Sequence, residues 1–304
     1  MKKFFITCIT FLLAAVTIAQ RNIEGIINVG TLQRVYLVHL PANYKANMPL
    51  PLVMIFHGGG GNYKQMQRYM AMDAIADKEN FITVYPNGIN KQWNDGREFK
   101  ESIAANDDVQ FINHLLDTLQ KTYAVDKKRV FATGILNGGF FSIYLSYKLA
   151  SRLLAIAPVC ASIPEKIFSE FYPAQPVSIL LINGTADPLV PYQGGRVGNG
   201  FTGGRGNCTS TDSTIQRFIT VNRAAVTPVI TSLPDTDTKD ECTATQYLYN
   251  STGNSKVCLI KINNGGHTLP GGGQYLPKFI VGRVCNDFKG NEMVWRFFKG
   301  CASR

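Results

Sequence analysis

Short runs of uninterrupted apolar residues recur through the first two thirds of the chain. Runs of this kind are typical of strands that are buried on both faces of a parallel sheet. We therefore predict a parallel sheet at the centre of the fold, built from the segments Pro51–Phe56, Phe81–Pro86, Arg129–Gly134, Leu153–Val159 and Val177–Asn183.

Strand segments of a second kind come in pairs near the two ends of the chain. Ile23–Val29 and Gln33–His39 are joined by a glycine turn, which predicts an antiparallel start. Gln246–Asn250 and Lys256–Ile262 form a later pair, which we predict to be a hairpin. The sheet should therefore be mostly, rather than entirely, parallel.

Helical segments separate the predicted strands. In Asp107–Tyr123 the apolar residues recur at i, i+3, i+4, i+7 and i+11, counted from Ile112, which places them on one helix face. We also predict helices over Gly138–Leu149 and Met293–Phe298, and a glycine-rich loop over Pro191–Asn207. Strands and helices in this alternation predict an α/β fold, with helices on both faces of a mostly parallel sheet.

The first residues of the chain have a different character. Lys2 and Lys3 precede an apolar run from Phe4 to Ala15, and small residues follow it. This pattern is typical of a secretory signal peptide, which we predict to end at Ala19. The run is shorter than the roughly 20 residues needed to span a bilayer, so we expect no stable membrane anchor. We predict a leader over residues 1–19 and a single domain over residues 20–304, in a secreted or periplasmic protein.

Charge adds little to this picture. The 304 residues carry a formal charge of +10, which becomes +8 when Lys2 and Lys3 leave with the leader. A basic balance could favour acidic partners, nucleic acid among them. The Lys and Arg residues are scattered, with no arginine-rich run and no aromatic–basic stripe. We therefore expect no nucleic-acid partner.

Six cysteines follow the leader, and an even number in an exported chain predicts disulfides. The sequence does not choose among the many pairings that six cysteines allow. Position favours Cys242 with Cys258, which flank the predicted hairpin, and Cys285 with Cys301 near the end. Because no C-x-x-C pair and no His/Asp/Cys cluster with ligand spacing occurs, we expect no metal and no cofactor.

Three segments with candidate chemistry follow predicted strands. Ester hydrolysis through a serine needs a nucleophile, a histidine base, a carboxylate that orients the histidine, and N–H donors for the oxyanion. The turn "FHGGGGN" follows Pro51–Phe56 and can offer such donors. Asp187 follows Val177–Asn183 in a proline-fixed turn, and His267 lies in a glycine-rich loop after the last strand. These segments predict three of the four requirements.

Taken together, the segments resemble secreted esterases of the polyhydroxybutyrate depolymerase and feruloyl esterase type, which have the α/β-hydrolase fold. The resemblance runs from about Val35 to Phe298, and the acid precedes the histidine as in that fold. The combination is specific, although each segment alone is not. It is carried by "YLVHLPANY", "FHGGGGN", "VYPNGINKQWNDGR", "NDDVQFINHLLDTLQKTYAVDKKRVFATGILNGG", "APV", "NGTADPLVPYQGG", "GGHTLPGG" and "VWRFF".

The resemblance implies a role for each matching residue. Asp187 would be the triad acid and His267 the base. The backbone N–H groups of Gly58, Gly59 and Asn137 would form the oxyanion hole.

The resemblance also implies contacts with substrate. Trp93 and Asn94 lie in a segment similar to the family's active-site rim, so they would touch the substrate, with plain packing as the alternative for Trp93. The implied substrates are carboxylic esters, such as a polyester or an acylated plant polysaccharide.

One position departs from the family pattern. The family's turn reads G-x-S-N-G-G, and here Gly134–Gly139 has Leu136 at the serine position. Leucine has no lone pair and no proton for His267 to remove. Deleting the nucleophile can cost a factor of about 10⁶ in turnover, with ~10³–10⁴ over water remaining, so we expect very weak hydrolysis at best.

Several alternatives stay open at this point. Ser142, Cys160 or Thr133 could replace the missing serine, or the histidine could activate a water. A single base change converts a serine codon to a leucine codon, so the leucine could be a sequence error or a recent inactivating mutation. The chain could instead be a catalytically silent protein that binds an ester or a polysaccharide. The sequence gives no indication of an oligomeric state.

Overall fold

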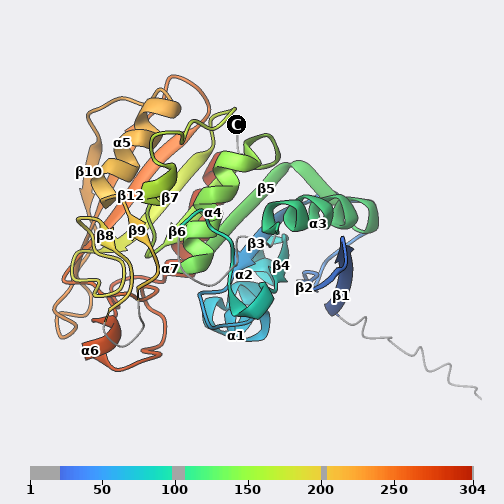
Figure 1. Cartoon of the computed structure of the whole chain (residues 1–304), viewed down its shortest axis with the longest axis horizontal. Coiled ribbons are helices and arrows are strands. Elements are labelled where there is room, and N and C mark those ends of the chain that lie inside the picture. Colours follow the sequence, from blue (N-terminus) through green and yellow to red (C-terminus); the bar gives the residue numbers. More distant parts are fainter. Residues whose placement is uncertain (1–20, 98–106, 200–203, 303–304) are drawn as a thin grey trace, which may run out of the picture.

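A ten-stranded sheet runs through the computed structural model, which describes residues 21–97, 107–199 and 204–302 (Figure 1). The spatial order of its strands is β1-β2-β4-β3-β5-β6-β7-β12-β11-β10. These strands are β1 (Asn22–Val29), β2 (Leu32–His39), β3 (Leu50–Phe56), β4 (Ile82–Pro86), β5 (Val125–Ile135), β6 (Ala155–Val159), β7 (Ser178–Gly184), β10 (Val229–Ser232), β11 (Thr243–Asn250) and β12 (Lys256–Asn263). Two further strands, β8 (Gly195–Arg196) and β9 (Asn207–Cys208), pair with each other.

The centre of the sheet is parallel and its two edges are antiparallel. Parallel pairing runs from β4 through β3, β5, β6 and β7 to β12. β1 and β2 extend one edge, and β11 and β10 extend the other, in antiparallel register. The prediction of a mostly parallel sheet is confirmed.

Helices cover both faces of the sheet (Figure 1). They are α1 (Tyr63–Met70), α2 (Met72–Glu79), α3 (Asp108–Thr122), α4 (Asn137–Lys148), α5 (Thr211–Val221), α6 (Lys278–Val281) and α7 (Gly290–Ala302). Buried residues of α3, α4 and α5 join one apolar cluster, and those of α1, α2 and α7 join another. Two apolar layers therefore enclose the sheet.

The alternation of side chains along each buried strand supplies both layers. Along β3, Leu52 and Met54 belong to the α3–α4 side, whereas Val53 and Ile55 belong to the α1–α7 side. Phe131 of β5 stacks on Phe298 of α7 with ring centroids 4.6 Å apart. This explains why the central strands are apolar throughout.

The arrangement of the strands corrects the expected cysteine pairs. In the β11–β12 ladder Cys258 lies opposite Leu248, and Cys242 lies six residues further along, roughly 20 Å away. Cys301 is eleven residues beyond Gly290 in α7, roughly 16 Å along the helix. Cys285 lies near the other end of α7, since Gly271 N–H donates to its carbonyl and Gly290 N–H to that of Pro270. Neither expected pair is bonded.

The predicted leader, residues 1–19, lies outside the described residues, so the signal peptide stays a prediction. Within the described part of the chain, no helix is both long and apolar enough to cross a bilayer.

Candidate active site

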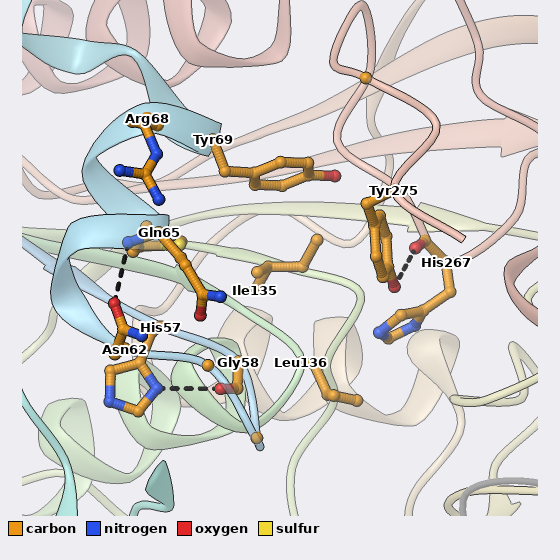
Figure 2. Close-up of a pocket in the computed structure, with 14 residues that line it drawn as sticks. His57, Gly58, Asn62, Gln65, Arg68, Tyr69, Ile135, Leu136, His267 and Tyr275 are labelled. Atoms are coloured by element: carbon orange, nitrogen blue, oxygen red, sulfur yellow. Dashed lines mark hydrogen bonds between the residues drawn. The ribbon is translucent and has the colours of Figure 1, made fainter.

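The loops that follow β3, β5, β7 and β12, together with the first residue of α4, carry every residue expected in the chemistry except the Trp93–Asn94 pair. These strands run parallel, so their carboxyl ends lie at one edge of the sheet, where ligands bind in open α/β folds. A cavity of about 640 Å³ opens there and is lined by residues that include Gly58, Leu136 and His267 (Figure 2). Its volume lies in the range that suits a small-molecule ligand.

Leu136 lies in a sharp turn between β5 and α4. Its backbone has φ 52° and ψ −123°, a conformation that a branched side chain rarely adopts. A Cβ on Gly138 would lie 2.2 Å from the Phe56 carbonyl oxygen, and one on Gly134 would lie 2.6 Å from Gly138. Only glycine allows the strand, the turn and the helix to approach this closely. The turn therefore has the strained strand-to-helix geometry of a nucleophile elbow.

Asp187 and His267 are joined in the interior. His267 Nδ1 lies 2.8 Å from Asp187 Oδ2, and the imidazole is fully buried. The other carboxylate oxygen accepts the N–H groups of Leu189 and Val190, both at 2.8 Å. Since a carboxylate only accepts hydrogen bonds, the imidazole proton lies on Nδ1. Nε2 is then the atom that can take up a proton.

His267 Nε2 has no hydrogen-bond partner within the described part of the chain. Figure 2 shows its ring beside the Leu136 side chain at the wall of the cavity. A Cβ on Gly58 would lie 3.7 Å from Leu136 Cβ, so Leu136 lies against the glycine loop as well. A buried polar atom without a partner is costly in a native fold and calls for an explanation. The arrangement leaves this imidazole nitrogen without a partner, with the alkyl side chain of Leu136 beside the ring.

The glycine loop after β3 uses part of its hydrogen-bonding capacity internally. Gly60 N–H donates to the Lys91 carbonyl at 2.9 Å, and Gly61 N–H donates to the Gly58 carbonyl at 3.0 Å. The backbone N–H groups of Gly58 and Gly59, which are the donors expected in the oxyanion hole, take no part in these two bonds. Both residues line the cavity.

His57 holds this loop in place through both of its ring nitrogens. Its Nδ1 donates to the Gly58 carbonyl at 2.9 Å, and its Nε2 accepts the Gly88 N–H at 2.9 Å. Both contacts require the neutral imidazole with its proton on Nδ1. Burial lowers the pKa of His57 to about 4, so it is neutral at neutral pH.

Asn137 connects the elbow to the segment before α3. It is the first residue of α4, where backbone N–H groups lack partners within their own helix. Its side-chain oxygen accepts Trp93 N–H at 2.8 Å, and its amide donates to the Trp93 carbonyl at 3.0 Å and to Asp95 at 2.6 Å. The Asn137 side chain therefore fixes the start of the helix. Asn137 itself is fully buried and is not among the residues that line the cavity, whereas the preceding Leu136 is.

Trp93 and Asn94 do not line the cavity. Trp93 is fully buried, stacks on Phe141 with centroids 4.9 Å apart, and donates from Nε1 to the His57 carbonyl at 3.0 Å. Asn94 N–H donates to Asp108 at 2.7 Å. Trp93 thus packs against the start of the glycine loop, which agrees with the packing alternative and not with the expected contact with substrate.

Comparison with known proteins finds similarity to esterases. Residues 33–158 match the family described as "Putative esterase". "Putative esterase NocK" of Nocardia uniformis subsp. tsuyamanensis is 28% identical over 228 residues, covering 73% of this chain and 66% of that protein. Feruloyl esterase B of Piromyces equi is 27% identical over 247 residues, covering 77% of this chain and 42% of the relative.

A solved structure supports the fold. An acetyl xylan esterase from Aspergillus awamori superimposes with a TM-score of 0.55 at 12% identity, covering 77% of this chain and 89% of the other. The family match extends from β2 to β6 and includes both the glycine loop and the elbow. The chain has the α/β-hydrolase fold, and its residues 33–158 are similar to the esterase family. It spans about two thirds of the length of NocK and less than half of feruloyl esterase B.

One wall of the cavity is formed by residues that the sequence did not reveal. Gln65, Arg68 and Tyr69 of α1 and Tyr275 after His267 line it (Figure 2). Tyr275 O–H donates to the His267 carbonyl at 3.0 Å, and its ring meets that of Tyr69 edge to face at 5.7 Å. Burial raises the pKa of Tyr69 to about 12, so its hydroxyl stays neutral. The two rings give the cavity an aromatic side.

Cys160 lies behind the acid–histidine pair. Its sulfur, an Asp187 oxygen and a His267 nitrogen lie within 4.8 Å of one another, a grouping that could offer ligands to a metal ion. Burial, followed by the nearby carboxylate of Asp187, raises the pKa of Cys160 well above its usual value. The carboxylate already holds the histidine and two backbone N–H groups. The sulfur is therefore a neutral thiol packed against the pair.

Proposed function

We propose that the cavity is a carboxylic-ester site of the serine-esterase type in which Leu136 stands at the nucleophile position. The observation that carries this proposal is the buried Nε2 of His267, which has no partner among the described residues and lies at the elbow. A serine hydroxyl at residue 136 would be the natural partner of that atom. The strained turn, which no helix or strand requires, supports the same interpretation.

With a serine at position 136, each part of the site would have a role. The serine oxygen would attack the ester carbonyl while His267 Nε2 takes its proton and later returns it to the leaving alcohol. Asp187 would hold the imidazole by Nδ1 and stabilise its charged form. The N–H groups of Gly58, Gly59 and Asn137 would stabilise the oxyanion. With Leu136, residue 136 offers no atom that can make the attack, so hydrolysis by the native chain should be very weak.

The other candidate nucleophiles are engaged elsewhere. Ser142 Oγ donates to the Gly138 carbonyl inside α4 at 2.8 Å, and Thr133 Oγ1 donates to the Ala157 carbonyl at 2.6 Å within the sheet. Cys160 is a buried neutral thiol, which is a poor nucleophile. None of these three side chains lines the cavity. This favours loss of the nucleophile over its relocation.

The substrate class is inferred from the relatives. Their names describe a feruloyl esterase and an acetyl xylan esterase, and the cavity is of a size that suits an acyl group. We infer an ester on a polyester or an acylated polysaccharide as the ligand. Export through the leader at residues 1–19 would place the domain of residues 20–304 where such polymers occur.

A catalytically silent binding protein is the second candidate. Leu136 itself favours it, because the cavity, the oxyanion loop and the acid–histidine pair remain in place around a side chain that cannot react. Such a protein would hold an ester or a polysaccharide without cleaving it.

One pair of proteins separates these candidates. The native chain and Leu136→Ser are purified, shown to be folded by circular dichroism, and assayed on a short-chain aryl ester. We expect the variant to exceed the native chain by on the order of 10³-fold or more in turnover. Adding His267→Ala or Asp187→Asn to Leu136→Ser should remove most of that gain.

Each result has a clear meaning. If the folded variant is as inert as the native chain, the esterase proposal fails. If the native chain is already fast, the account of Leu136 is wrong. If only the variant is active and the native chain binds an acylated polysaccharide, the silent binding protein is the better description.

A further inference from the structure

The segments 236–242 and 283–287 run side by side next to the loop that carries His267. One Asp240 carboxylate accepts Cys242 N–H at 2.7 Å with one oxygen and Asn286 N–H at 2.6 Å with the other. In return, Asp287 Oδ1 of the second segment accepts Thr236 N–H of the first at 2.8 Å. Because the backbone N–H groups of Cys242 and Asn286 share one carboxylate, the two segments are held close together at these residues.

Two cysteines face each other across this junction. Cys242 and Cys285 are both almost completely buried. The Cys242 thiol donates to the Asp240 carbonyl and the Cys285 thiol to Asp287 Oδ2, both at 3.5 Å, so each thiol lies at the aspartates of the junction. The neighbouring Cys242 thiol, followed by burial, raises the pKa of Cys285 well above its usual value. Both belong to the same apolar cluster.

We propose that Cys242 and Cys285 form a structural disulfide in the mature protein. The structure holds them as thiols, with the backbone already placed for the bond. Oxidation would remove two protons and two electrons from the pair, and a protein or glutathione disulfide would take them up and become two thiols. The exchange passes through a mixed disulfide, which the second cysteine resolves.

The bond would tie down the histidine loop. Gly266 N–H donates to the Arg283 carbonyl at 2.9 Å, and His267 N–H donates to the Val281 carbonyl at 2.5 Å. Gly271 N–H donates to the Cys285 carbonyl at 2.7 Å. The backbone from Val281 to Cys285 thus holds the histidine loop through these hydrogen bonds. The disulfide would link this segment to the residue before β11. Its effect on ester chemistry depends on the proposed function, but the bond itself does not.

Peptide mapping tests the pairing directly. The full chain is produced in an oxidising compartment, unfolded with excess alkylating agent, digested without reduction and analysed by mass spectrometry. We expect a peptide that joins Cys242 to Cys285 and separates after reduction. Cys208→Ala, which removes a buried cysteine elsewhere, should leave that peptide unchanged. Cys242 joined to Cys258 or Cys301, or both cysteines alkylated without reduction, would overturn the proposal.

A second measurement addresses the loop. Reduction of the native protein with dithiothreitol should raise amide hydrogen exchange across residues 264–284 and lower Tm by roughly 5–10 °C. The Cys242→Ser/Cys285→Ser double variant should exchange fast in that range before reduction and not change further. Unchanged exchange in the reduced native protein would show that the bond does not hold the loop. If the double variant does not fold, the peptide map of the native chain still decides the pairing.

Discussion

His57 holds the glycine loop after β3 with both ring nitrogens, and this makes the loop sensitive to acid. Its pKa is near 6.5 in an unfolded chain and about 4 in the fold, because burial disfavours the charged ring. Between these values the unfolded chain binds the proton and the folded chain does not. Stability should therefore fall as the pH is lowered from about 6.5 to 4, by up to about 3 kcal/mol from this residue.

Urea unfolding at a series of pH values checks this expectation. His57→Gln should be less stable than the native chain at pH 7, because it loses the two loop contacts. Its stability should decline less steeply between pH 6.5 and 4, because the titrating ring is gone. His114→Gln, which removes an exposed histidine from α3, should keep the native slope. An unchanged slope in His57→Gln would place the acid sensitivity in another group.

Single residues differ in how far the sequence specifies their place. Asp187 and His267 follow buried strands that run parallel, and topology alone brings such strand ends together. Trp93 lies in a segment rich in Gly, Asn and Asp that suggests an exposed rim, yet it packs between Phe56 and Phe141. Which side of a loop faces inward depends on tertiary contacts that no local pattern records.

At the scale of elements, the strands were the most predictable part. Each predicted strand overlaps a strand of the sheet. The central strands were predictable because a doubly buried strand must be apolar throughout. Four helices were not predicted, α1, α2, α5 and the single turn of α6. α1 buries only Met66 and Met70, between polar residues, and α2 begins two residues after α1 ends. α5 is rich in Thr, Ile and Val, which are weak helix formers. Packing against the sheet, rather than local propensity, stabilises α1, α2 and α5.

The contact between β3, the elbow and α4 gives a prediction at this scale. Gly138→Ala places a methyl group 2.2 Å from the Phe56 carbonyl oxygen and 2.6 Å from its carbon. Neither backbone atom can move without shifting β3 or α4. We expect the variant to lose about 2–3 kcal/mol or more of unfolding free energy, measured by chemical denaturation. Gly253→Ala, where a Cβ meets no atom within 4 Å, should change stability little. Equal stability of both variants would mean that α4 can slide away from β3.

At the scale of the whole molecule, one sheet packs against an apolar layer on each of its two faces. Every central strand gives alternate side chains to each layer, so neither layer can form without the sheet. Breaking the strands exposes both layers at once. We therefore expect the described chain to unfold as a single cooperative unit, as the prediction of one domain over residues 20–304 implies.

The two tryptophans report on the two layers separately. Trp93 stacks on Phe141 on the α4 side, and Trp295 stacks on Phe81 on the α7 side, with centroids 3.8 Å apart. Trp295→Phe leaves only the first signal, and Trp93→Phe leaves only the second. In each variant, the fluorescence midpoint in guanidinium should coincide with that variant's own far-ultraviolet dichroism midpoint. This internal comparison cancels whatever stability the substitution itself removes. A fluorescence transition that precedes the loss of dichroism in either variant would mean that one layer melts away from a sheet that persists. The two layers would then be separate folding units on opposite faces of the same sheet.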